Sequence, residues 1–241
     1  MNNLPVNLIP WTVSSFVLLL LSIRSLTNYR RVRSPLSKYF AIGGLLAAIA
    51  TGLWSLPYLY YDPETNKQIL RTALLVGDLS LYLAFIYQVR IMWYLMLRKH
   101  IKYVYLLIPS LILAVAGYYG GVAATLADST YPRIINERVF LPTSQQGDVA
   151  QSIFLLTILI TGVYFLRKSY LGKSRSAKLG TFALGILYLG IGLGSLLNII
   201  ISTESGTNTS PFVLITYFIG TAVFLMCFIF FRIYEYIKAK D

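Results

Sequence analysis

Asp78 is the acidic residue best placed to do chemistry, because it lies in the middle of a long apolar segment. An ionised group at the centre of a membrane-spanning helix costs about 2.5–3.5 kcal/mol, so it needs a partner or water. A helix of about 3.6 residues per turn places Arg71, Asp78 and Tyr82 on one face. This pattern predicts a contact with a ligand, proton or ion. A structural, hydrogen-bonded acid is an equal alternative.

Three polar residues are candidate partners for the Asp78 carboxyl group. Arg71 lies about 10 Å further out along the same helix, because each residue advances about 1.5 Å. Asn198 and Ser195 lie on a later apolar segment and are alternatives. We therefore expect a site for a ligand or an ion that is built from Asp78, Arg71, Tyr82, Asn198 and Ser195.

The residues that usually carry catalysis or bind metals are scarce in this chain. Its single cysteine, Cys227, lies in an apolar segment, and its single histidine, His100, lies in a basic turn. The sequence has no phosphate-binding glycine loop, no paired carboxylates and no serine or cysteine beside a usable histidine. We therefore expect no catalytic residues, no metal site, no cofactor and no enzymatic activity.

The elements that hold these residues are predicted to be membrane-spanning helices. Hydrophobic residues make up 56% of the chain and charged residues only 12%, whereas charged residues make up about 25% of a soluble domain. A helix needs about 20 predominantly apolar residues to cross a bilayer. The sequence therefore predicts an all-α fold, with residues 1–241 forming a single domain of seven transmembrane helices. The predicted spans are 8–23, 39–60, 69–97, 103–126, 149–166, 179–201 and 212–233.

The lysines and arginines between these spans predict their orientation. Alternate connections carry sixteen of these residues in one set and four in the other. The basic set remains in the cytoplasm. The N-terminus is therefore predicted outside and the C-terminus inside. The net charge of +12 then favours anionic lipid headgroups at the inner loops over nucleic acid as a partner.

Small residues and one proline predict how the helices pack. Gly190 and Gly194 have the four-residue spacing that lets two helix backbones approach closely, either within the chain or between copies. Pro109 frees a backbone carbonyl inside the fourth span and predicts a kink there. The segments that enter spans two and six match weakly, with Lys38 against Lys178 and Gly52 against Gly192. True duplication would give two three-helix repeats joined by the fourth span.

The stretch YRRVRSPLSKYFAIGGLLAAIATGLWSLPYLYY, the later RKHIKYVYLLIPSLILAVAG and the final FRIYEYI carry a family resemblance. With its arginine-rich first inner loop, late tryptophan in span two and Ile108-Pro109 step, the chain resembles the N-terminal seven-helix sensor region of some bacterial histidine kinases. The resemblance implies sensing of a signal in or across the membrane. Here the chain ends at Asp241 without a kinase domain, so its signal would pass to a separate partner.

Three functional interpretations remain open. The first is a receptor-like or sensory protein that binds a small or lipophilic ligand in its helix bundle and signals to a partner. The second is a small-solute transporter or channel with three-plus-one-plus-three repeats. The third is a non-catalytic subunit of a membrane complex. All three place the chain in the cell membrane of a bacterium or archaeon.

Overall fold

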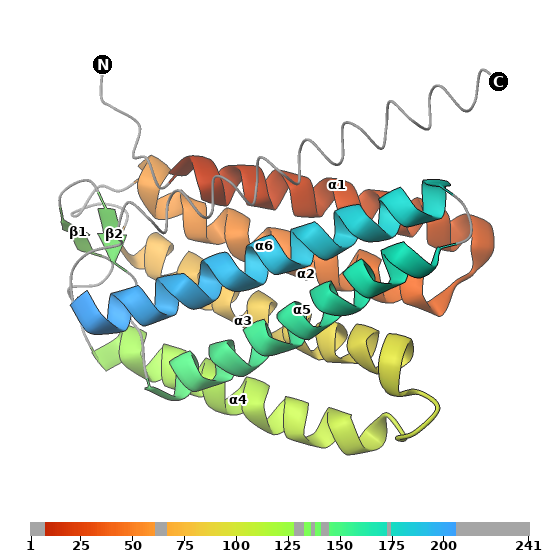
Figure 1. Cartoon of the computed structure of the whole chain (residues 1–241). Coiled ribbons are helices and arrows are strands. Elements are labelled where there is room, and N and C mark those ends of the chain that lie inside the picture. Colours follow the sequence, from red (N-terminus) through yellow and green to blue (C-terminus); the bar gives the residue numbers. More distant parts are fainter. Residues whose placement is uncertain are drawn as a thin grey trace. The chain divides into compact units, whose positions relative to one another are not determined.

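The computed structural model describes residues 8–60, 67–127, 133–135, 138–140, 145–172 and 175–205, and it describes side chains in 12–56, 67–127, 145–172 and 178–193. Over these ranges the chain is helical apart from one short hairpin (Figure 1). The α-helices are α1 (Leu8–Val32), α2 (Pro35–Tyr60), α3 (Lys67–Met92), α4 (Val104–Ala127), α5 (Gln145–Leu171) and α6 (Arg175–Ser205). A π-helical turn, η1 (Trp93–Leu97), continues α3. The predicted all-α class is confirmed.

Four of the described helices are long and apolar enough to cross a membrane. They are Pro35–Leu56, Lys67–Leu97, Val104–Ala127 and Gln145–Leu171, and Lys178–Leu193 is a shorter apolar helix. These lengths indicate an integral membrane protein. The predicted span 212–233 lies outside the described residues. The count of seven spans and their orientation therefore remain predictions.

Helix α1 continues further than the sequence predicted. We expected an inner loop from Arg24 to Lys38, but α1 ends at Val32 and α2 begins at Pro35. The basic and polar residues after Ile23 are compatible with a helix in water, so the end of the apolar run does not end the helix. Arg33 ends it, with a left-handed backbone (φ 55°) and an amide that donates to the Tyr29 carbonyl (2.8 Å).

The predicted outer connection between spans four and five contains regular structure. Strands β1 (Arg133–Ile135) and β2 (Arg138–Phe140) pair antiparallel, with Ile134 opposite Val139. Strand β2 also contacts α2. The sequence did not predict these strands, because three residues are too few to give an alternating pattern.

The chain forms two compact units, Met1–Gln151 and Ser152–Asp241, and each is described by itself. In the first, α1 packs on α2, α2 on α3, and α3 on α4. Ser15 and Ser22 of α1 donate hydrogen bonds to the carbonyls of Ala48 (2.8 Å) and Ala41 (2.6 Å) of α2. The order of these pairs shows that the two helices are antiparallel. Such hydrogen bonds between helices are a usual source of stability in lipid.

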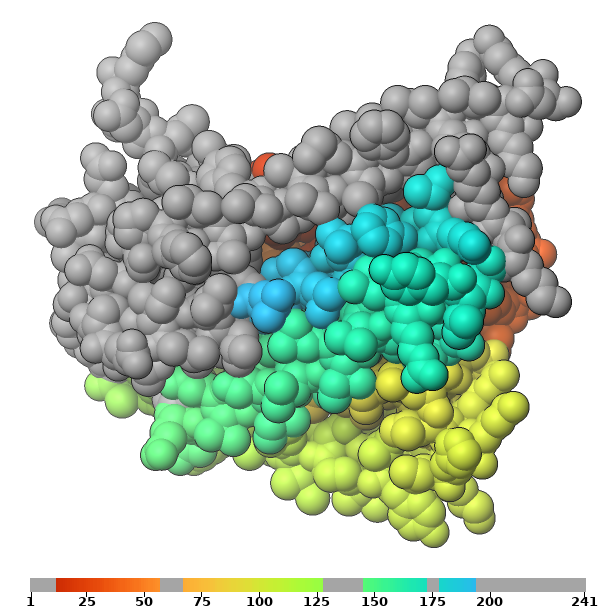
Figure 2. Space-filling view, viewed as in Figure 1, coloured from red at the N-terminus to blue at the C-terminus, as the bar shows by residue number. Residues whose placement is uncertain are grey.

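The surface of α4 is apolar along one side. Large exposed side chains recur every three or four residues at Tyr105, Ile108, Ile112, Val115 and Tyr119. Figure 2 shows the outer surface of this helix in yellow-green. Buried positions include polar residues such as Thr125, which is 1% exposed. Apolar residues outside and small or polar residues inside suit a helix that faces lipid.

In the second unit, α5 and α6 pack closely through glycines. A Cβ atom on Gly185 would lie 2.6 Å from Leu166 Cδ2, and one on Gly192 would lie 2.6 Å from Leu159 Cδ2. The glycines in contact are thus seven residues apart and lie on one face of α6. Gly190 is partly exposed, and the surroundings of Gly194 lie outside the described residues. The packing role predicted for Gly190 and Gly194 stays a prediction.

Helix α4 runs through Pro109 without interruption. Proline cannot donate a backbone hydrogen bond, so the carbonyl four residues earlier loses its usual helical partner. The adjacent Ser110 hydroxyl donates to the Leu106 carbonyl (2.5 Å). This bond satisfies Leu106 and not Tyr105, whose carbonyl is the one that Pro109 leaves without a donor. The kink at Pro109 stays a prediction.

Candidate functional site

The Asp78 carboxylate on α3 is held by a tryptophan of α2. Trp54 Nε1 donates a hydrogen bond to Asp78 Oδ1 at 3.1 Å. Trp54 is buried, and Asp78 is partly exposed. Gly77 permits this arrangement, because a Cβ atom there would lie 2.8 Å from the indole nitrogen. Asp78 therefore has a fixed donor on the α2 side.

Two glycines of α4 lie against the polar face of α3, one beside Asp78 and one beside Tyr82. A Cβ atom on Gly121 would lie 3.3 Å from Asp78 Oδ2. One turn away, a Cβ atom on Gly117 would lie 2.6 Å from Tyr82 Cε1. Gly117 and Gly121 have the four-residue spacing of small residues at helix contacts in membranes. They let α4 approach the polar face of α3 closely.

The polar face of α3 makes two further contacts with the backbone of neighbouring segments. Tyr82 Oη donates to the Gly147 carbonyl at the start of α5, at 3.5 Å. Arg71 donates through Nη2 to the Thr125 carbonyl near the end of α4. Carbonyls in the last turn of a helix lack helical donors and carry the negative end of its dipole. Arg71 therefore stabilises the end of α4, and its described contact is with this carbonyl instead of the predicted partner Asp78.

The structure brings together three of the five predicted site residues. Arg71, Asp78 and Tyr82 all face α4 from one side of α3. The side chains of Asn198 and Ser195 lie outside the described residues. Sequence reasoning missed the role of Trp54 and the pair Gly117 and Gly121. The spacing Gly117-x-x-x-Gly121 was the available signal for the second of these.

A second polar cluster lies at the other end of α3. The guanidinium carbon of Arg90 lies 4.5 Å from the ring centre of Tyr39 and 4.9 Å from that of Tyr103. Arg90 Nε is buried and has no hydrogen-bond partner in the part of the chain that the structure describes. Two aromatic rings thus fix the Arg90 side chain by cation–π contacts.

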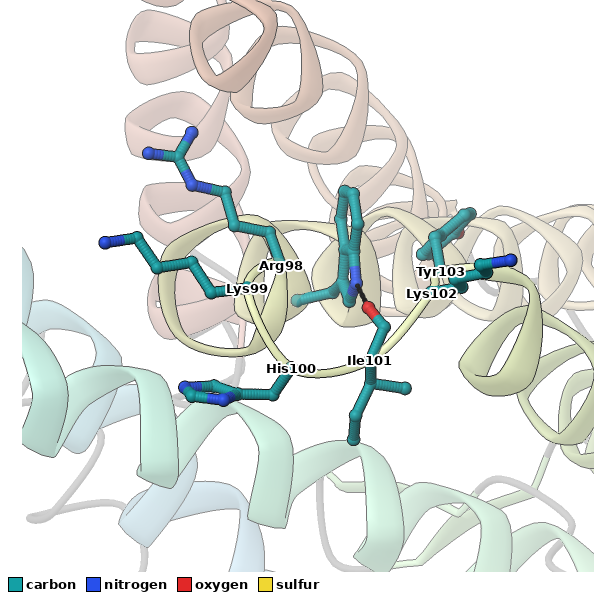
Figure 3. Close-up of a pocket in the computed structure, with 7 residues that line it drawn as sticks. Arg98, Lys99, His100, Ile101, Lys102 and Tyr103 are labelled. Atoms are coloured by element: carbon teal, nitrogen blue, oxygen red, sulfur yellow. Dashed lines mark hydrogen bonds between the residues drawn. The ribbon is translucent and has the colours of Figure 1, made fainter.

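The turn between η1 and α4 lines an open cavity of about 330 Å³. Trp93 Nε1 donates across it to the Ile101 carbonyl at 2.6 Å, and Figure 3 marks this bond. Arg98 and Lys99 extend to one side of the turn and Lys102 to the other (Figure 3). His100 is exposed. Because these cationic side chains point in different directions, they do not converge on one position where a ligand could bind.

A different cavity, of about 310 Å³, lies among the end of α1, the start of α2 and the end of α3. Its lining includes the cations Arg33, Lys38 and Arg90. Asp78 lines neither of these two cavities. Within the described ranges, no three His, Cys, Asp or Glu residues are grouped so that they could hold a metal ion.

Comparisons of the sequence and structure with models of known protein families, with curated proteins and with solved structures give no significant match.

Proposed function

We propose that the chain is a receptor-like or sensory membrane protein with seven transmembrane helices, its N-terminus outside and its C-terminus in the cytoplasm. In this proposal a small or lipophilic ligand binds beside Asp78 within the helix bundle. The response passes to a separate cytoplasmic partner. The resemblance of the sequence to the sensor regions of histidine kinases favours this class.

The observation that carries the proposal is the partly exposed Asp78 carboxylate, which accepts a hydrogen bond from Trp54. A carboxylate in an apolar helix attracts a cation or a hydrogen-bond donor, and functional sites are common at such residues. A ligand that competes with the Trp54 donor would change the contact between α2 and α3. A lipophilic amine is the simplest compound with both the charge and the solubility to reach this position.

Helix α3 also offers a route from this site to the inner loops. Asp78 lies in the middle of α3, where it contacts α2 and α4. The π-helical turn Trp93–Leu97 follows the C-terminal end of α3. Short π-helical turns are frequent at functional sites. A small movement of α3 would therefore be transmitted to Arg90 and to the turn at residues 98–103.

Tryptophan fluorescence tests ligand binding directly. Trp11→Phe and Trp93→Phe together leave Trp54 as the sole indole in the full chain. In vesicles of neutral lipid, lipophilic amines should change the Trp54 emission saturably, and Asp78→Asn should weaken the response at least tenfold. The control is Thr72→Ala, on an exposed position of α3, which should respond as the parent does. An equal response in Asp78→Asn would contradict the proposal.

A small-solute transporter or channel is the second candidate. One observation favours it: Gly52 of α2 and Gly192 of α6, which the weak internal repeat makes equivalent, each pack against the preceding helix. A Cβ atom would lie 3.0 Å from Ser15 Oγ at Gly52 and 2.6 Å from Leu159 Cδ2 at Gly192. Flux of the same amines into proteoliposomes would favour transport, whereas saturable binding without flux favours sensing.

A complex subunit is the third candidate, and its test is biochemical. Such a subunit would co-purify with a defined membrane partner in fixed stoichiometry. A sensory protein would instead contact a soluble partner through its basic inner loops.

A further inference from the structure

The cavity between α1, α2 and α3 has the composition of an anion site. Three cations line it, Arg33, Lys38 and Arg90, together with the tyrosines Tyr29, Tyr39 and Tyr87. Lys38 lies on α2 and Arg90 on α3, and Arg33 directly follows the end of α1. The cavity volume of about 310 Å³ lies at the lower end of the range for small-molecule sites.

The segments that build this cavity contain nothing to neutralise its charge. No aspartate or glutamate occurs in residues 1–61 or 79–127. The start of α2, beside Pro35, adds the positive end of a helix dipole. A negatively charged group is therefore the occupant that the electrostatics favour.

Arg90 provides a fixed donor for such a group. Tyr39 and Tyr103 hold its guanidinium at 4.5 and 4.9 Å from their ring centres. Its buried Nε has no acceptor among the described residues. The planar guanidinium group matches the oxygens of a phosphate in a two-point contact, which a lysine cannot reproduce.

Arg33 lines the cavity and has an unfavourable backbone conformation. Its φ of 55° is a conformation that glycine adopts far more readily than other residues. Its guanidinium carbon lies 5.8 Å from the Tyr29 ring centre, within the same cavity lining. Strained residues of this kind concentrate at functional sites.

We infer that this cavity binds the phosphate group of an anionic molecule, with Arg90 as the fixed contact and Arg33 and Lys38 as the outer ones. An anionic phospholipid headgroup and a soluble phosphate ester both supply this group. The inference is independent of the proposed ligand at Asp78. By the predicted orientation, the cavity opens to the cytoplasmic side of the membrane.

The test uses the full chain in nanodiscs. For the lipid arm, phosphatidic acid is added to phosphatidylcholine nanodiscs, and the lipid retained by the protein is measured by native mass spectrometry. For the soluble arm, glycerol 3-phosphate is titrated calorimetrically into the protein in phosphatidylcholine alone. Retention only of phosphatidic acid identifies a headgroup site, and saturable binding of glycerol 3-phosphate identifies a soluble ligand.

Variants distinguish specific binding of phosphate in this cavity from nonspecific attraction of anions to a basic surface. Arg90→Gln should weaken binding about tenfold or more, and Arg90→Lys should restore it only in part. Arg98→Gln is the matched control, because Arg98 lies 4.8 Å from the Tyr94 ring centre but does not line this cavity. It should change binding by less than about twofold.

Arg33→Gly keeps the test decisive if Arg90→Gln does not fold. Glycine suits the left-handed backbone at residue 33, so this variant should fold and still bind more weakly. Binding that is unchanged in Arg33→Gly and Arg90→Gln would overturn the inference. Failure of both phosphate compounds to bind the parent protein would overturn it as well.

Discussion

The hydrogen bond from Trp54 to Asp78 explains how an acid is accommodated in an apolar helix. Its length of 3.1 Å is normal for an N–H donor. Hydrogen bonds between membrane helices stabilise by about 0.6 kcal/mol on average and by up to about 1.7 kcal/mol. This bond therefore offsets only part of the cost of an ionised group there, so a protonated carboxyl or a bound cation is favoured at this position.

A double-mutant cycle measures this contact. Trp54→Phe should destabilise the folded protein, and its combination with Asp78→Leu should show a coupling energy of about 1 kcal/mol. The measurement is the free energy of unfolding in mixed micelles. Trp54→Phe combined with Thr72→Ala is the reference pair and should be additive. Additivity of Trp54→Phe with Asp78→Leu would mean that the bond contributes nothing.

Among the individual residues of the candidate site, the sequence predicted the position of Asp78 and the helix face that it shares with Arg71 and Tyr82. It did not predict the partner, because the contact of Trp54 with Gly77 depends on how α2 and α3 pack. Helical periodicity relates residues within one helix and says nothing of the register between two helices. The contact of Arg71 with the Thr125 carbonyl was missed for the same reason.

Close packing between helices depends on glycines at particular positions. Gly117 of α4 lies against Tyr82 and Ala150, where a Cβ atom would come within 2.6 Å of each. Both neighbours are buried, so they have little room to move. Glycine here maintains the spacing between α3 and α4.

Gly117→Ala should therefore destabilise the protein by about 1–3 kcal/mol, the usual effect of overpacking. Gly44→Ala is the matched control, because its Cβ atom would lie 3.5 Å from Ser22 Cβ, an ordinary contact distance. It should be neutral or slightly stabilising, since alanine favours helix more than glycine. Thermal denaturation in one detergent compares the two. Equal melting temperatures would show that α3 and α4 can separate without loss.

Helix boundaries show where the sequence was and was not informative. The long apolar runs predicted most of α2 to α5, but the apolar run in α1 ends before the helix does. Residues 24–32 are helical without an apolar pattern, so hydropathy could not predict this part of α1. The break at Arg33 and Ser34 precedes Pro35, and a residue before proline avoids helical backbone angles.

The end of α1 gives a separate prediction. Arg33→Gly should stabilise the fold by about 1 kcal/mol, because glycine has no steric penalty at a positive φ. Arg30→Gly, within α1, should instead destabilise by about 1 kcal/mol. Unfolding midpoints of the two variants should therefore move in opposite directions. If both fall, then α1 does not end with a left-handed residue 33.

For the whole molecule, the central claim is that the basic connections face the cytoplasm. The charge count alone predicts this orientation. The proposed partner contact depends on this orientation, as does the side of the membrane to which the phosphate cavity opens. The apolar surface of α4 and the four long apolar helices indicate a membrane protein. They do not show which end of each helix faces the cytoplasm.

Cysteine labelling in intact cells tests this claim most directly. In a Cys227→Ser background, single cysteines replace Ser34, between α1 and α2, and Gln68, at the start of α3. A membrane-impermeant maleimide should label position 68 from outside and position 34 only after permeabilisation. Labelling of position 34 in intact cells, with position 68 protected, would contradict the orientation.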